Sequence, residues 1–221
     1  MELTPRLRLA LTLCAGGRSL IDVGCDHAYL CLAAVQSGFE HAFASDLREG
    51  PLAAAKEHIA LAGASASVQA VLCPGLEGFS PEDGDTVSIC GMGGELIASI
   101  LEQAPWTKDG AHTLVLQPMT CADRLRRWLA DNGYAILQER LAAEGDKLYL
   151  AMQVRGGTDD CGRDNFYLFT EKLKDDPLFP LFLERETARV EKAAAGKRLA
   201  GLDTAAEEAV LYRLKEVRHG A

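Results

Sequence analysis

Two acidic residues and a glycine alternate at the end of the first strand-like run of the chain. Asp22, Gly24 and Asp26 fall within residues 20–30, which continue as a helix-like pattern. The glycine lets the backbone approach a ligand closely, and the carboxylates favour a cationic ligand over a pyrophosphate. A dinucleotide site would instead show G-x-G-x-x-G and present a helix N-terminus to phosphates. The turn therefore favours S-adenosyl-L-methionine, which is cationic at its ammonium and sulfonium and carries no phosphate, and disfavours NAD.

Turns after the next strand-like runs could complete a site for this donor. Asp46 lies roughly 20 residues beyond the first turn, where a carboxylate can accept hydrogen bonds from both ribose hydroxyls. Gly75-Leu76 can flank the adenine ring, and the glycine-rich residues 91–94 would line the same opening. Each acid alone could equally cap a helix, and the glycines could form a simple tight turn, but their joint spacing favours a binding site. The residues predicted to bind the donor are Asp22, Gly24, Asp46, Leu47, Gly75, Leu76, Gly91 and Met92.

Strand-like and helix-like runs alternate along most of the chain, which predicts parallel β-α-β units. A ligand of such a doubly wound sheet lies outside the carboxyl ends of the strands, where the turns after the first and fourth strands face each other. The predicted strands span 19–23, 41–45, 68–72, 86–90 and 113–116, followed by an antiparallel hairpin of 135–141 and 148–154. The predicted helices among them span 27–37, 51–61, 95–103 and 122–131. The fold class is therefore α/β, with a seven-stranded, mostly parallel, Rossmann-like sheet.

The last part of the chain has a different pattern. Residues 155–160 are polar and glycine-bearing, and no strand pattern recurs beyond them. Two helices over 178–200 and 203–218, rich in Ala, Leu, Glu, Lys and Arg, form a predicted hairpin. We therefore predict a donor-binding catalytic domain over 1–157 and a helical extension over 158–221.

Composition and charge narrow the class of protein. The chain has 221 residues, is 48% hydrophobic and contains no apolar run long enough to span a membrane and no amino-terminal signal segment, so we expect a cytoplasmic protein. The seven cysteines are odd in number and form no C-x-x-C pair, which predicts reduced thiols and no metal site. The net charge of −9 arises within residues 1–160, because residues 161–221 hold 11 basic and 11 acidic side chains. Electrostatic attraction is local over about 8 Å, so the acidic total does not exclude a nucleic-acid partner.

Several motifs resemble those of the bacterial TrmK family of tRNA adenine-N1 methyltransferases. They are the D-x-G-x-D-H-A-Y-L string at 22–30, G-M-G-G at 91–94, Leu116-Gln117-Pro118 and Asn132-Gly133-Tyr134, and the similarity covers about residues 3–155. The resemblance implies S-adenosyl-L-methionine as donor and adenine 22 in the D-arm region of tRNA as target. It also implies a class I methyltransferase sheet whose coiled-coil-like C-terminal extension helps to hold tRNA. We further expect a monomer.

Three residues depart from the family pattern. Pro74 stands where an asparagine is expected, Met119 replaces the asparagine of Gln-Pro-Asn, and Leu150 stands where an acidic residue is common. The first two changes remove amides that could hydrogen-bond in the adenosyl pocket and in the target-base pocket. None of the three changes the first turn.

Adenine N1 carries an in-plane lone pair, so its methylation needs no prior removal of a proton. Correct positioning supplies about 7–11 kcal/mol, against roughly 3–6 kcal/mol from a general base, so we predict orienting residues. Asp26 would accept a hydrogen bond from the exocyclic amino group and raise the electron density at N1. His27 or Tyr29 would stack on or orient the base, and Gln117 would hydrogen-bond to its edge.

The target base must leave its stack because N1 lies on the pairing edge, so the RNA must be held elsewhere. One candidate is Arg6, in an amphipathic helix predicted over 3–15 and begun by Thr4-Pro5. A solvated charged face is the alternative interpretation of every basic group. The residues predicted to bind tRNA are Arg6, Arg126, Lys192, Lys197 and Arg198.

Two other functions remain open from the sequence. A methyltransferase of the same fold could act on a small molecule, in which case the helical extension would be dispensable for activity. Alternatively, the chain could be a non-catalytic donor-binding module that recruits partners through its helical hairpin.

Overall fold

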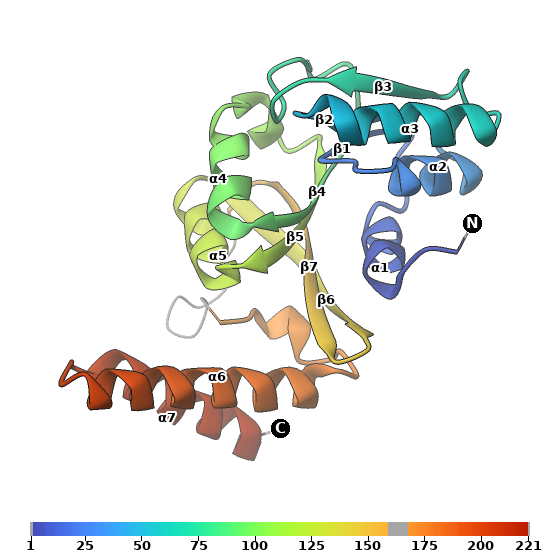
Figure 1. The fold of residues 1–221 in the computed structure, drawn as a ribbon. Coiled ribbons are helices and arrows are strands. Elements are labelled where there is room, and N and C mark those ends of the chain that lie inside the picture. Colours follow the sequence, from blue (N-terminus) through green and yellow to red (C-terminus); the bar gives the residue numbers. More distant parts are fainter. Residues whose placement is uncertain (1, 159–167, 221) are drawn as a thin grey trace. The chain divides into compact units, whose positions relative to one another are not determined.

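The computed structural model describes residues 2–158 and 168–220 and divides into two compact units, Met1–Lys172 and Leu173–Ala221 (Figure 1). Five parallel strands and a terminal antiparallel hairpin form one sheet in the first unit, in the order β3-β2-β1-β4-β5-β7-β6. The strands are β1 Ser19–Val23, β2 His41–Asp46, β3 Val68–Leu72, β4 Thr86–Gly93, β5 Thr113–Thr120, β6 Tyr134–Glu144 and β7 Lys147–Gly156. The predicted seven-stranded, mostly parallel sheet is confirmed.

Helices pack against both faces of this sheet (Figure 1). They are α1 Pro5–Leu13, α2 Tyr29–Gln36, α3 Glu49–Leu61, α4 Gly94–Glu102 and α5 Ala122–Asp131. The chain also forms short 3-10 helices at Pro105–Lys108 and Glu171–Leu173. Helix α1 begins as predicted, because the Thr4 hydroxyl accepts a hydrogen bond from the Leu7 amide at 3.4 Å and Pro5 occupies the first turn.

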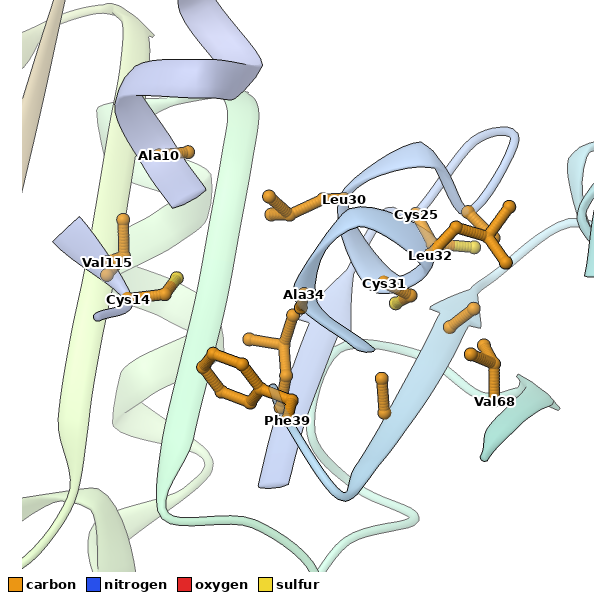
Figure 2. Packing of buried hydrophobic residues seen from close by; sticks show 14 of the residues in the cluster. Ala10, Cys14, Cys25, Leu30, Cys31, Leu32, Ala34, Phe39, Val68 and Val115 are labelled. Carbon is orange, nitrogen blue, oxygen red and sulfur yellow. The ribbon is translucent and has the colours of Figure 1, made fainter. Parts of the chain in front are cut away.

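The core beneath α1, α2 and α3 consists of small and branched side chains. Figure 2 shows Ala10 of α1 and Cys14, the C-terminal cap of that helix, close to Val115 of β5, with Leu30 and Ala34 of α2 in the same cluster. Leu20 of β1 also belongs to this cluster. Because strand side chains alternate between faces, the residue two positions beyond Leu20 shares its side of the sheet. That residue is Asp22, the first of the two acidic residues at the start of the predicted donor site.

Among the strands that run further than predicted, β4 and β5 extend through residues that were expected to form the turns beside the candidate site. β4 continues through Gly91 to Gly93, and β5 continues to Thr120, because Cys90 pairs with Gln117 and the register then shifts in a bulge. Gly91 has φ +79°, which a residue with a side chain adopts only under strain. The glycine-rich residues 91–94 are therefore a bulged strand end that leads directly into α4, and not the separate turn that was predicted after the fourth strand.

The second unit contains the predicted helical hairpin. It consists of α6 Phe179–Leu199 and α7 Ala205–Gly220, separated by a turn that contains Gly201. Lys197 pairs with Glu207 at 2.7 Å, and Arg198 pairs with Glu208 at 2.9 Å, which places the two helices antiparallel beside the turn. The predicted domain boundary beside residue 157 stays a prediction, because residues 159–167 lie outside the described residues.

Six cysteines are described, and all are free thiols, whereas Cys161 lies outside the described residues. Within residues 2–158 and 168–220, no group of three His, Cys, Asp or Glu side chains could hold a metal ion. No helix in the same part of the chain is long and apolar enough to cross a membrane.

Candidate active site

The carboxyl ends of the parallel strands bring the predicted turns to one edge of the sheet. β1 pairs with β2 on one side and with β4 on the other, so the order of the strands reverses between β1 and β4. Val23, at the end of β1, is in register with Ser45 of β2 and Ile89 of β4. The turns after these strands therefore open at a topological switch point, where doubly wound proteins bind ligands.

Asp22 lies buried beneath this opening and is 4% exposed. Its carboxylate accepts a hydrogen bond from the Ser88 hydroxyl of β4 and a weak one from the Cys31 thiol of α2, at 3.9 Å. Burial raises the pKa of Asp22 to about 6, although Ser88, the charge of Arg6 and Cys31 each act to lower it. Burial also raises the pKa of the neighbouring Cys90 thiol to about 12, so this thiol stays neutral. The site thus contains a buried carboxylate whose charge a cationic ligand would stabilise.

Asp22→Asn is expected to increase the stability of the ligand-free protein at neutral pH. The pKa of Asp22 rises from 3.8 to about 6 on folding, so the native state binds more protons than the unfolded state between these values, and stability falls as pH rises through them. Removing the charge should increase the free energy of unfolding by up to about 3 kcal/mol at pH 7, and by much less below about pH 4. Urea unfolding at both pH values measures the difference. An equal effect at both pH values would contradict this account.

The loop after β1 has an unusual backbone. Two successive amides, beginning at Gly24, donate to the Ser45 carbonyl at 2.8 and 2.9 Å, which ties the loop to the end of β2. Gly24 has φ +76°, and a Cβ there would lie 2.4 Å from Cε of Met92. Asp26 and Ala28 also have positive φ angles, 52° and 59°, which non-glycine residues adopt only where their surroundings hold them. Local sequence patterns give no indication of these last two conformations.

Three aromatic rings gather on this loop and on α3. The ring centroids of His27 and Tyr29 are 5.4 Å apart, and His58 of α3 lies 5.3 Å from His27 and 5.2 Å from Tyr29. The Asp26 carboxylate is 73% exposed and lies 3.6 Å from Nε2 of His27. α2 begins at Tyr29, two residues later than predicted, because the preceding residue is left-handed. The sequence analysis found three of these residues but missed His58.

The other predicted donor residues lie at the end of β2 and in the turns that follow β2 and β3. Asp46 is buried, and its Oδ1 accepts a hydrogen bond from the Arg48 amide at 2.9 Å. Leu47 is exposed beside it, whereas Leu76 is buried. Gly75 has φ +56°, and a Cβ there would lie 3.3 Å from Ile100. The structure therefore places these residues at the edge of the sheet where β1 and β4 also end.

The Gln117 side chain connects β5 to the end of β4 and to α1 through hydrogen bonds. Its side chain is fully buried, and its Oε1 accepts hydrogen bonds from Arg6 Nη1 and from the Gly91 amide, both at 3.1 Å. Arg6 also lies over the Tyr149 ring, 5.8 Å from its centroid. Gln117 Nε2 donates to Met119 Sδ at 3.6 Å, so the residue that departs from the family pattern contacts the same amide. Arg6, predicted to hold tRNA, thus lies inside the candidate site, and the sequence analysis missed Tyr149.

The structure corrects the prediction for one RNA-binding residue. Arg126 is 1% exposed, and its guanidinium contacts the buried Glu139 carboxylate at 2.8 Å. Its side chain is part of the packing between α5 and β6 and is not available on the surface. In the helical hairpin, Lys192 is exposed, whereas Lys197 and Arg198 take part in the ion pairs described above.

A strand order with its switch point at β1 and β4, acidic residues at that point and a further acid at the end of β2 are features of a methyltransferase of the Rossmann-like class. Residues 3–152 match a family model described as a methyltransferase domain, so the chain belongs to the methyltransferase domain family. The predicted class I fold is confirmed. The chain is 32% identical over 169 residues, covering 76% of its length and 71% of the relative, to the tRNA (adenine(22)-N(1))-methyltransferase of Bacillus subtilis strain 168. The chain therefore belongs to the family of tRNA (adenine(22)-N1)-methyltransferases.

Solved structures agree over nearly the whole chain. Sp1610 of Streptococcus pneumoniae in complex with S-adenosyl-L-methionine has a TM-score of 0.85 and 30% identity, covering 98% of this chain and 99% of that one. The B. subtilis m1A22 tRNA methyltransferase TrmK has a TM-score of 0.77 and 27% identity, covering 97% of this chain and 95% of that one.

Proposed function

We propose that this protein transfers a methyl group from S-adenosyl-L-methionine to N1 of adenine 22 in tRNA. The observation that carries the proposal is the loop after β1, which places an exposed Asp26 carboxylate and the rings of His27 and Tyr29 directly beyond buried Asp22. Membership of the tRNA (adenine(22)-N1)-methyltransferase family supports both the donor and the target.

The residues at the switch point fit the donor. Gly24 has no side chain where the loop faces Met92, and the acids suit a ligand that is cationic and free of phosphate. When bound, S-adenosyl-L-methionine supplies an electrophilic methyl group on its sulfonium. Asp22 would hold the ammonium group, and Asp46 would accept hydrogen bonds from the ribose hydroxyls. Leu47, Gly75, Leu76 and Gly91 would line the remainder of the donor site.

The loop residues would orient the target base. Asp26 accepts a hydrogen bond from the exocyclic amino group, which increases the electron density at N1 and stabilises the cationic product. His27 and Tyr29 stack on the base, which excludes water from the reacting atoms. Because N1 already has its lone pair, no residue needs to remove a proton, and the contribution of the protein is orientation. The contact predicted between Gln117 and the base edge would require that Gln117 exchange one of its present partners.

The helical hairpin would contribute to tRNA binding. Lys192 is exposed on α6, and the Arg198–Glu208 ion pair lies at the surface, where such a pair contributes little to stability. Arg198 can therefore exchange its glutamate for a phosphate at small cost. Lys197 pairs with the less exposed Glu207 and would have to leave this partner to bind a phosphate. We also infer a monomer that acts in the cytoplasm, where its tRNA substrate is found, and size-exclusion chromatography tests the first of these statements.

Incubation of the protein with labelled donor and unmodified tRNA, followed by nucleoside analysis, tests the proposed function. Label is expected in N1-methyladenosine, and its yield should fall to background with a matched tRNA that carries guanine at position 22. Transfer to free nucleosides but not to tRNA would favour the small-molecule alternative. Donor binding without any transfer would favour the non-catalytic binding module.

Asp46→Ala is expected to weaken donor binding much more than it slows the chemical step. Loss of charge-assisted hydrogen bonds to the ribose should raise the donor Kd about 10- to 100-fold, while kcat at saturating donor changes little. Isothermal titration calorimetry gives the Kd. Asp46→Asn is the matched control, because it retains an acceptor for the Arg48 amide and separates the loss of charge from loss of the turn. An unchanged Kd with reduced kcat would exclude Asp46 from the donor site.

A further inference from the structure

His58 of α3 connects that helix to the loop after β1. Its Nδ1 lies 3.1 Å from the backbone carbonyl oxygen of His27. A carbonyl oxygen only accepts hydrogen bonds, so the contact requires that His58 Nδ1 carries the hydrogen and donates. The ring also stacks on Tyr29, with the ring planes at 17° and the centroids 5.2 Å apart. One side chain therefore holds the loop through both a hydrogen bond and ring stacking.

The carbonyl that His58 contacts belongs to the most constrained part of the loop. His27 lies between the two left-handed residues, Asp26 and Ala28, with φ angles of 52° and 59°. Such conformations cost free energy and persist only where surrounding contacts hold them. A different contact holds the start of the loop, because the Gly24 amide donates a hydrogen bond to the Ser45 carbonyl. His58 thus contacts the half of the loop that carries Asp26 and leads into Tyr29, the first residue of α2.

We propose that His58 is a positioning residue for the target base. By donating to the His27 carbonyl and stacking on Tyr29, it holds the Asp26 carboxylate and the ring of Tyr29 in the arrangement that receives the adenine. The proposal rests on the proposed function for the identity of that base. Because a misplacement of about 1 Å can reduce the rate about 100-fold, loosening this half of the loop should lower kcat. Donor affinity should remain, since Asp22 and Asp46 lie on elements that His58 does not hold.

Two substitutions separate the contributions of the hydrogen bond and the ring. In His58→Asn, the side-chain amide nitrogen can take the place of Nδ1 and keep the donor while the ring is lost. In His58→Phe, the ring remains and the donor is lost. His41→Asn is the control, because it replaces an exposed histidine at the opposite end of β2 from Asp46.

His58→Phe is expected to lower kcat on tRNA about 10- to 100-fold with a donor Kd within about 2-fold of the wild type, and His58→Asn should recover most of the rate. His41→Asn should match the wild type. Wild-type kcat in His58→Phe, or a parallel loss of donor affinity, would overturn the proposal.

Hydrogen exchange of the loop amides tests the same inference without using activity. In His58→Phe, the amides of residues 26–29 should exchange faster than in the wild type, while those of α4 should not change. Unchanged exchange in the loop would overturn the positioning role even if kcat fell. If the wild-type protein methylates no tRNA, the proposed function fails, whereas the exchange measurement still decides whether His58 holds the loop.

Discussion

Asp26→Ala is expected to abolish measurable methyl transfer to tRNA while most of the donor affinity remains. The Asp26 carboxylate is 73% exposed and therefore accessible to a base from solution, whereas Asp22 is 4% exposed. Removing the Asp26 carboxylate would eliminate the proposed charge-assisted hydrogen bond to the base, which strengthens as N1 becomes cationic, and losses of this kind reduce rates about 100- to 1,000-fold. Initial rates at saturating donor, together with calorimetric donor Kd values, separate the two effects.

The backbone at this position requires a second variant. Asp26 has φ 52°, which alanine adopts less readily than aspartate or asparagine, so Asp26→Ala also strains the loop. Asp26→Asn keeps the local conformation and one acceptor oxygen but removes the charge, and we expect an intermediate rate. If donor affinity disappears together with transfer in both variants, Asp26 belongs to the donor site and its assignment to the base is wrong.

Glu139→Ala is expected to reduce the free energy of unfolding by about 3–5 kcal/mol. Two guanidinium nitrogens of Arg126 contact Oε1 of Glu139, both at 2.8 Å, and both side chains are buried. The other carboxylate oxygen accepts a hydrogen bond from the Thr170 amide at 2.7 Å. The substitution therefore removes one carboxylate partner from the buried Arg126 guanidinium and an acceptor from the buried Thr170 amide. Urea unfolding at pH 7 gives the difference.

Two companion variants identify the cause of that loss. Glu139→Gln keeps an acceptor oxygen but removes the negative charge, so it measures the contribution of the charge alone. The double variant Arg126→Met, Glu139→Leu removes both ions, and it should recover most of the loss except the hydrogen bond to Thr170, which is worth about 1 kcal/mol. A loss below about 1 kcal/mol in Glu139→Ala would show that the pair is not effectively buried. Since Arg126 is internal, we expect its substitution to change stability rather than the KM for tRNA.

Elements with strong local signals were predictable from the sequence. The bounds of β1 and α5 agree with the structure, because an apolar run between polar ends and an amphipathic repeat are properties of neighbouring residues. The N-terminal cap of α1 is equally local, since Thr4 and Pro5 act within one turn. Motif similarity pointed to the family, which the 32% identity over 169 residues to a tRNA (adenine(22)-N(1))-methyltransferase confirms.

The loop after β1, where the sequence analysis began, was identified by its acids and its glycine, but its shape was not. Its two left-handed residues and its contact with His58 depend on α3, which follows later in the chain. Likewise, Arg6 reaches Gln117 only because α1 and β5 meet in space. Arg126 shows the same limit, since an arginine on an amphipathic helix suggests a surface until the fold places Glu139 beside it. Residue types and local spacing therefore determined the class of ligand and the strand pattern. Only the tertiary structure decided which charged side chains are buried, paired or exposed, because burial and pairing depend on elements that are distant in sequence.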